Sequence, residues 1–192
     1  MKREVDAVNV HVPGVRSFRG TTPRLGAQVW VDPGAHVIGD VTLGDDCSVW
    51  PGAVIRGDMH SITIGARCSV QDCAVLHITH DSRFNPGGYP LVVGDDVSIA
   101  HQAVLHGCTI GSRVVIGMQA MVMDGAVVGD DVILAAGSLV PPGKVFEGGM
   151  LYRGRPAQPV RPLTAEELAF LPYVAGNYVK LKDQYLAEPA TL

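Results

Sequence analysis

The sequence predicts an all-β fold: a left-handed parallel β-helix of hexapeptide repeats, with a C-terminal α-helix packed on the outside. Two observations predict the β-helix. Aliphatic residues recur at every sixth position over two long stretches, and a small or β-branched residue follows most of them four positions later. Glycine and aspartate often come directly after the aliphatic position, as in Leu43-Gly44-Asp45-Asp46. A third observation, the helical spacing of apolar residues close to the C-terminus, predicts the helix.

The six-residue period excludes an amphipathic α-helix and a series of β-hairpins. It scatters aliphatic side chains all round an α-helix of about 3.6 residues per turn, and hairpins show turn signals only about every 8–12 residues. A coil of three short strands fits, because each hexapeptide then forms one face of a triangular prism with its large and small residues inside. The aliphatic positions are Val31, Val37, Leu43, Val49 and Ile55 in the first array, and Ile110, Ile116, Val122, Val128, Leu134 and Val140 in the second.

The period is disturbed in the middle of the chain. A segment from about residue 80 to 91 breaks it and is predicted to be a protruding loop, and the step from Ile99 to Val104 is five residues instead of six. Breaks in a regular solenoid are where function tends to lie, and the alternative is a tolerated insertion. Histidines on both sides of the break favour function.

The predicted organisation is an N-terminal extension (1–26), a β-helix domain (27–145) and a connector with a C-terminal helix (146–192). Thr164 and Glu167 form a capping box at the start of the helix, and Pro172 should kink or restart it. Apolar residues follow at helical spacing: Val174, Tyr178, Leu181 and Tyr185. A β-helix this short exposes its coil ends and one flat face, which favours oligomers.

Composition narrows the function classes. The 192 residues are 47% hydrophobic with a net charge of −4, and no run of Lys or Arg exceeds two residues, which argues against nucleic acid and anionic membranes as partners. The N-terminus lacks an apolar segment and no stretch of about 18 apolar residues occurs, so we expect a cytoplasmic protein without signal peptide or membrane span. Four cysteines without CxxC spacing are expected to be small buried residues, with a zinc-thiolate site as the alternative: Cys47, Cys68, Cys73 and Cys108.

Three histidines, His77, His101 and His106, fall in the disturbed coils. Imidazoles on neighbouring strands about 4.8 Å apart can converge on one ion. Three neutral nitrogens with one open position are typical of catalytic zinc, which lowers the pKa of a bound water to about 7. The alternative is that each is a hydrogen-bonded structural residue of its strand.

Other polar residues lie on the same coils. Arg56 and Asp58 precede Gln71 and Asp72 by about one coil. They are candidates to orient a metal ligand or its product, and the alternative is a structural ion pair such as Arg56 with Asp72. Tyr178 would reach this place only if the C-terminal helix packs there, and its alternative role is helix packing.

These segments resemble the γ-class carbonic anhydrases, and more closely the bacterial γ-carbonic anhydrase-like hexapeptide proteins. The resemblance rests on four runs, Arg56-Gly57-Asp58, Ile64 to Asp72, Val75-Leu76-His77 and Ala100 to Cys108, and covers nearly the whole chain, including Asn177-Tyr178. It implies a homotrimer that binds zinc, or else iron(II) or cobalt, at its subunit interfaces. Metal-bound hydroxide would convert carbon dioxide reversibly to bicarbonate, as a carbonate dehydratase-like lyase.

The resemblance also implies roles for single residues. His77 and His106 would come from one subunit and His101 from its neighbour. Arg56 would pair with acidic residues across the interface, and Asp58 and Asp72 match structural acids of the family. Gln71 matches a glutamine beside the metal-bound solvent.

Two positions depart from the archetypal enzyme of the class. Met59 follows Asp58 where a glutamate is expected, and His80 lies where a loop glutamate would be. His80 is a candidate proton shuttle, because an unperturbed histidine has a pKa of about 6.5. Three alternatives stay open: a hexapeptide acyltransferase, a metal-dependent ester or thioester hydrolase at the same site, and a non-catalytic trimer stabilised by its metal.

Overall fold

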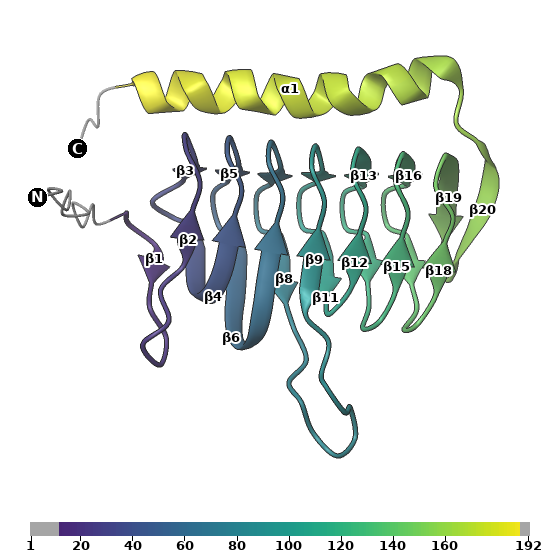
Figure 1. Ribbon diagram of the computed structural model, residues 1–192. Coiled ribbons are helices and arrows are strands. Elements are labelled where there is room, and N and C mark those ends of the chain that lie inside the picture. Colours follow the sequence, from purple (N-terminus) through teal and green to yellow (C-terminus); the bar gives the residue numbers. More distant parts are fainter. Residues whose placement is uncertain (1–11, 189–192) are drawn as a thin grey trace, which may run out of the picture.

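The computed structural model describes residues 12–188, which form a prism of stacked strands with one long helix lying along it (Figure 1). Strands of successive coils pair in parallel, as β11 does with β8 and β14, whereas β19 and β20 at the end of the prism pair in antiparallel. The predicted parallel β-helix with an outer C-terminal helix is confirmed.

The prism has three faces. The twelve-stranded sheet supplies two of them, because β4 and β6 continue round the edge from one to the other. The first face contains β1 (Val15–Arg16), the starts of β4 (His36–Leu43) and β6 (Val54–Ile64), β8 (Val75–His77), β11 (Val104–His106), β14 (Met121–Val122) and β17 (Leu139–Val140). The second contains β2 (Arg24–Leu25), the ends of β4 and β6, β9 (Leu91–Val93), β12 (Thr109–Ile110), β15 (Val127–Val128) and β18 (Val145–Phe146).

The third face is the eight-stranded sheet. It contains β3 (Trp30–Val31), β5 (Ser48–Val49), β7 (Ser69–Val70), β10 (Ser98–Ile99), β13 (Val114–Ile116), β16 (Val132–Leu134), β19 (Met150–Gly154) and β20 (Ala157–Pro162). We name each edge by the faces that it joins in chain order: the 1–2 edge, the 2–3 edge and the 3–1 edge.

The interior is built from the two arrays that the sequence predicts. Aliphatic side chains stack in columns, such as Val37 on Ile55 and Leu76 on Leu105, and both arrays are buried. Stacking at the spacing of parallel strands places large and small side chains in alternation, which is the pattern that fills a narrow interior. This core sets the position of every corner residue outside it.

The 1–2 edge alone interrupts the six-residue spacing of the buried aliphatic positions. From Val31 to Tyr152, successive buried positions of the inward-facing columns are six residues apart wherever the chain crosses the 2–3 or the 3–1 edge. The exceptions are three successive steps of nine, seventeen and five residues, from Ile55 to Ile64, from Leu76 to Val93 and from Leu105 to Ile110.

The predicted five-residue step between Ile99 and Val104 is therefore wrong. Leu105 is fully buried, whereas Val104 on the same strand points outward, so the step from Ile99 to Leu105 is six. The short step comes one edge later, next to His106. All three irregular corners thus lie on one edge of the prism, and the protruding loop leaves from the same edge (Figure 1).

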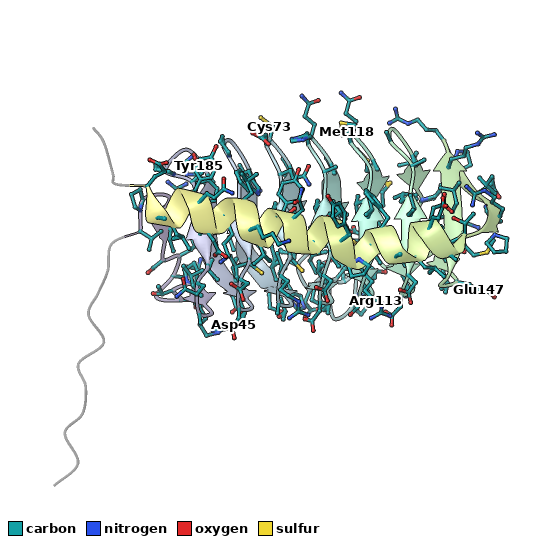
Figure 2. The ribbon with its side chains drawn as sticks, turned by 90° about the horizontal axis from the view of Figure 1, so that it is seen from above. Asp45, Cys73, Arg113, Met118, Glu147 and Tyr185 are labelled. Carbon is teal, nitrogen blue, oxygen red and sulfur yellow. The ribbon has the colours of Figure 1, made fainter. Side chains whose placement is uncertain are left out.

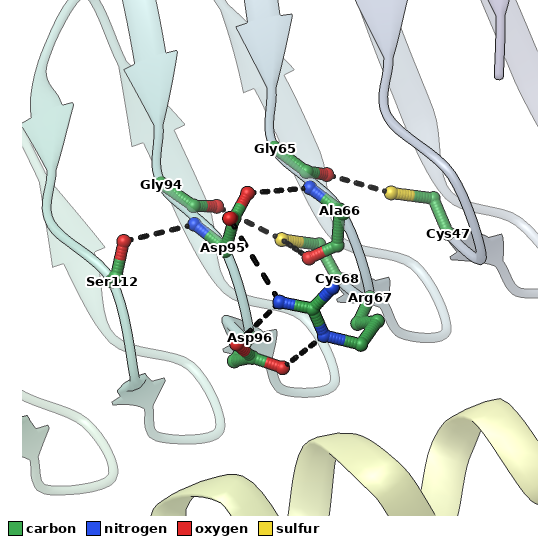
Figure 3. Close-up of polar contacts among 9 residues, drawn as sticks. All are labelled: Cys47, Gly65, Ala66, Arg67, Cys68, Gly94, Asp95, Asp96 and Ser112. Carbon is green, nitrogen blue, oxygen red and sulfur yellow. Dashed lines mark hydrogen bonds and ion pairs between the residues drawn. The ribbon is translucent and has the colours of Figure 1, made fainter.

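The cysteines follow the expectation at three of four positions. Cys47, Cys68 and Cys108 are buried and free, and burial raises the pKa of the Cys108 thiol to about 12. The Cys47 and Cys68 thiols donate to the carbonyl groups of the next coil (Figure 3). Cys73 is exposed instead, because it occupies an outer corner with a left-handed φ of 58°.

Ion pairs tie successive coils together at the 2–3 edge. The Arg67 guanidinium donates to both oxygens of Asp96, at 2.6 and 2.8 Å, and lies 3.8 Å from Asp95 (Figure 3). Arg113, two coils further on, makes the same arrangement with Asp131. These carboxylates raise the pKa of both guanidinium groups, and together the pairs fix the corners of this edge.

The helix α1 (Ala165–Ala187) starts as predicted. The Thr164 side chain accepts from the Glu167 backbone N–H and Glu167 accepts from the Thr164 N–H, which confirms the capping box. The predicted restart at Pro172 is absent, because the helix runs through this residue without a break. No helix within residues 12–188 is long and apolar enough to cross a membrane.

The helix lies over the third face, between the edge with Cys73 and Met118 and the edge with Asp45 and Arg113 (Figure 2). Trp30 packs against the Tyr185 ring with centroids 4.7 Å apart. The buried side of the helix is Leu171, Ala175 and Lys182, whereas Leu181 is exposed. The pattern of apolar residues does not predict this buried side of the helix, because the aliphatic part of the Lys182 side chain packs as an apolar residue does.

Lys182 anchors the helix to the prism. Its side chain is fully buried, and its Nζ contacts Asp46 at 2.8 Å and Asp183 beside it. Replacing Lys182 by alanine should lower the free energy of unfolding by about 1–3 kcal/mol, since a charge-assisted contact and the packed stem are both lost. Denaturant unfolding at fixed protein concentration measures the change. The exposed Lys180→Ala is the matched control, and equal midpoints for the two variants would contradict the anchor.

Candidate metal centre

Each of the three predicted histidine ligands has its own carboxylate. Asp58 Oδ1 lies 3.1 Å from His77 Nε2, and Asp124 Oδ1 lies 2.6 Å from His106 Nδ1. Asp72 Oδ2 lies 2.8 Å from His101 Nδ1. A carboxylate only accepts, so each contact holds a proton on that nitrogen and leaves a lone pair on the other. Among the six histidines of residues 12–188, these three are the ones with such a partner.

The lone pairs of His77 and His106 point at each other. His77 Nδ1 lies 3.1 Å from His106 Nε2, and these are the two nitrogens that the carboxylates leave without a proton. Burial, with Arg56 and His106 adding to it, lowers the pKa of the His77 imidazole, so protonation of this ring is disfavoured. A cation between the two acceptors would satisfy both lone pairs.

A divalent metal ion fits this pair. Two imidazole nitrogens that bind zinc at about 2.0–2.1 Å in tetrahedral geometry lie about 3.3 Å apart. The observed separation of 3.1 Å is close to that value. The imidazole–carboxylate pairs supply the arrangement that orients histidine ligands around metals in general.

Arg56 and Asp58 support His77. Arg56 Nη1 donates to Asp58 Oδ2, while Asp58 Oδ1 accepts from His77. Burial alone would raise the pKa of Asp58, but the hydrogen bonds from His77 and Arg56 lower it overall. Asp58 is therefore ionised at neutral pH. Within one chain Arg56 pairs with Asp58, whereas the Arg56–Asp72 pair of the structural alternative does not form.

The other predicted residues lie at the 3–1 edge. His101 and Asp72 form their pair there with 46% of each side chain exposed. Gln71 is buried beside them and donates from Nε2 to Ser69 Oγ at 3.3 Å. Tyr178 reaches the same side from the helix. Burial raises the pKa of its hydroxyl, and Asp72 adds to the shift.

One chain thus holds two separate halves of the predicted site. The 1–2 edge carries Arg56, Asp58, His77 and His106, the 3–1 edge carries the His101 group, and the first face lies between them. Within residues 12–188 of a single chain, no three His, Cys, Asp or Glu side chains converge as a metal site. His80 is exposed at the start of the protruding loop.

The first face is hollowed next to His106. The hollow has a volume of about 310 Å³, and its other lining residues are Val104, Met121, Met123 and Asp124. Val75, one coil away on the same face, is also exposed. The hollow lies between β11 and β14, where it contacts His106 but not His77.

Sequence reasoning missed Asp124 and Thr79, whose hydroxyl donates to Asp124 Oδ2 at 2.8 Å. Asp124 stands in a regular part of the repeat, where an aspartate before glycine is an ordinary turn residue. It lies 18 residues after His106, one more than the 17 residues that separate Leu105 from its partner Val122 on the next coil. Acidic residues one coil away from a candidate histidine are the signal that would have found it.

The fold and the repeat define a hexapeptide-repeat β-helix protein, which here carries three histidine–aspartate pairs. The family model of the bacterial transferase hexapeptide, with six repeats, matches residues 22–57 and 107–142. The chain is 52% identical to protein YrdA of Escherichia coli over 90% of its own length and 94% of that protein. It is 39% identical to the mitochondrial gamma carbonic anhydrase 1 of Arabidopsis thaliana over 88% of its own length and 61% of that protein.

A solved structure agrees. The hexapeptide transferase family protein from Anaplasma phagocytophilum superposes with a TM-score of 0.80 at 37% identity, over 88% of this chain and 96% of that one. The chain belongs to the hexapeptide-repeat family related to the γ carbonic anhydrases.

Proposed function

We propose that this protein binds a divalent metal ion between the subunits of a homotrimer and catalyses the reversible hydration of carbon dioxide to bicarbonate. The observation that carries the proposal is the set of three imidazole–carboxylate pairs, which fall on the three histidines expected to be ligands. Membership of a family related to the γ carbonic anhydrases supports the same reaction.

The ligands would be His77 and His106 of one subunit with His101 of its neighbour. The two halves of the site lie on different edges of one prism, so a second copy packed against the 1–2 edge would supply the missing imidazole. Zinc is the proposed metal, with iron(II) or cobalt as alternatives. A bound ion of this kind lowers the pKa of a water ligand to about 7 and so supplies a nucleophile at neutral pH.

The residues of this chain would prepare the centre for that chemistry. Asp58, Asp72 and Asp124 fix the tautomers of the three imidazoles, and Arg56 keeps Asp58 ionised. Gln71 and Tyr178 would reach the centre together with His101 of the neighbouring copy. The apolar first face suits carbon dioxide, which has no charge to solvate.

Carbon dioxide hydration also releases a proton, which must reach bulk water. His80 is the proposed acceptor. It is exposed and stands three residues after His77, at the start of the loop that projects from the 1–2 edge (Figure 1).

Metal removal tests the proposal. Stopped-flow assays on chelated protein should lose nearly all carbon dioxide hydration, and one equivalent of zinc per subunit should restore it, because no other group of the centre generates the nucleophile. The oligomeric state must be measured alongside, so that loss of activity is not loss of the trimer. Full metal occupancy without hydration would reject the reaction and leave metal binding as the conclusion.

A further inference from the structure

We infer that Thr79 and Asp124 form a positioning pair for His106, and that through Thr79 the protruding loop is joined to the metal centre. The part that concerns the metal rests on the proposed function, whereas the part that concerns the His106 tautomer does not. Neither residue belongs to the site that the sequence predicts.

Asp124 has both carboxylate oxygens engaged by this chain. Oδ1 accepts from His106 Nδ1 at 2.6 Å, and Oδ2 accepts from the Thr79 hydroxyl at 2.8 Å. Two fixed donors leave the carboxylate one orientation, in which it faces the back of the imidazole. His106 Nε2 then points at His77, and Asp124 is kept from turning round to bind the ion itself.

The Thr79–Asp124 contact spans two coils. Thr79 follows β8, Asp124 follows β14, and β11 with His106 lies between them. The bridge passes over Gly107, where a Cβ would overlap Asp124 Oδ1 and lie 2.7 Å from Tyr89 Cβ. A side chain at this position would therefore separate the pair, and the missing residue in the short corner brings the two coils within reach.

Thr79 also closes the neck of the protruding loop. Its N–H donates to the Tyr89 carbonyl at 3.1 Å, and its carbonyl accepts from the Tyr89 N–H at 2.8 Å. Thr79 thus hydrogen-bonds to the end of the loop through its backbone and to Asp124 through its side chain. Any movement at the neck of the loop is passed to His106 by two hydrogen bonds.

The pair on His106 parallels the one on His77 but differs in charge. Asp58 is held by the Arg56 guanidinium, whereas Asp124 is held by a neutral hydroxyl. A neutral partner withdraws less charge from the carboxylate, so Asp124 is the stronger acceptor toward its imidazole. Loss of the Thr79 hydroxyl should therefore change directly how Asp124 holds the His106 imidazole.

Two readouts test the inference. Histidine side-chain ¹H–¹⁵N spectra of the metal-free full-length protein should show His106 as the Nδ1–H tautomer in the wild type and in Thr79→Ser. Thr79→Val should give a mixture of tautomers, and Asp124→Asn should favour Nε2–H, because the amide can donate to Nδ1. Zinc competition titrations should show affinity lowered about 10-fold by Thr79→Val and about 10–100-fold by Asp124→Asn, with Thr79→Ser close to wild type.

Wild-type tautomer and affinity in Thr79→Val, with native circular dichroism, would overturn the inference. A wild type that binds no zinc, but whose His106 tautomer still responds to Thr79→Val, would reject the proposed function and support the positioning pair. Rescue by serine but not by valine separates the hydroxyl contact from general packing, since valine keeps the shape of threonine.

Discussion

His106→Ala is expected to lower zinc affinity by at least about 100-fold and to abolish carbon dioxide hydration, because it removes one of two facing lone pairs inside a single subunit. Asp124 would lose its imidazole partner, and the site would keep only His77 from the same chain. Metal content after dialysis and stopped-flow hydration measure the two effects on one preparation.

His36→Ala is the matched control for this change. His36 is exposed at the start of β4 on the same face of the prism, with no carboxylate partner among the described residues. This variant should keep wild-type metal content and activity. If His106→Ala bound zinc as the wild type does, the ligand assignment would be wrong, whatever the activity of the protein.

Mixing two inactive variants should restore part of the activity. His101→Ala and His106→Ala subunits each lack one ligand, but a site built from His77 and His106 of the first variant and His101 of the second is intact. In trimers that contain both variants, about one third of the sites should carry such a complete set. The measurement is hydration and metal content of the co-expressed, doubly tagged oligomer.

Activity that stays at zero in mixed oligomers of confirmed composition would contradict a site shared between subunits. Mixing His77→Ala with His106→Ala is the control, because those two ligands lie on one chain and no mixed site regains both. The comparison separates sharing of ligands from a general stabilising effect of assembly.

The sequence predicts the prism well because its period has one geometric solution. Large aliphatic residues six apart and small residues between them fill a three-sided coil, and the buried columns follow that pattern from Val31 to Tyr152. The capping box at Thr164 is equally local. A motif that is complete within four residues needs no information from the rest of the chain.

The misplaced irregular step has a different cause. Val104 and Leu105 are adjacent and both aliphatic, so the sequence does not say which one points inward. Only stacking on Leu76 and Val122 decides in favour of Leu105. The roles of Asp124 and Lys182 were not predicted for a related reason, since they depend on partners 18 or more residues away in the sequence.

A site shared between subunits would also need information that one chain does not contain. The sequence resemblance implies that His101 joins His77 and His106, and within a single chain His101 lies at another edge of the prism. Pairing of each histidine with an aspartate is visible only once the coils are stacked. The aspartates are separated from their histidines by 18 to 29 residues.

The confinement of irregular spacing to the 1–2 edge makes the architecture modular. The 2–3 edge is tied by arginine–aspartate pairs and the third face is covered by the helix, but a corner on the 1–2 edge can gain or lose residues while the inward columns keep their register. The three neighbouring corners can therefore differ in length on one prism, provided that the contacts joining their side chains, such as His77 to Asp58 and Thr79 to Asp124, are kept. Loops of new length could be grafted there without changing the fold of the prism.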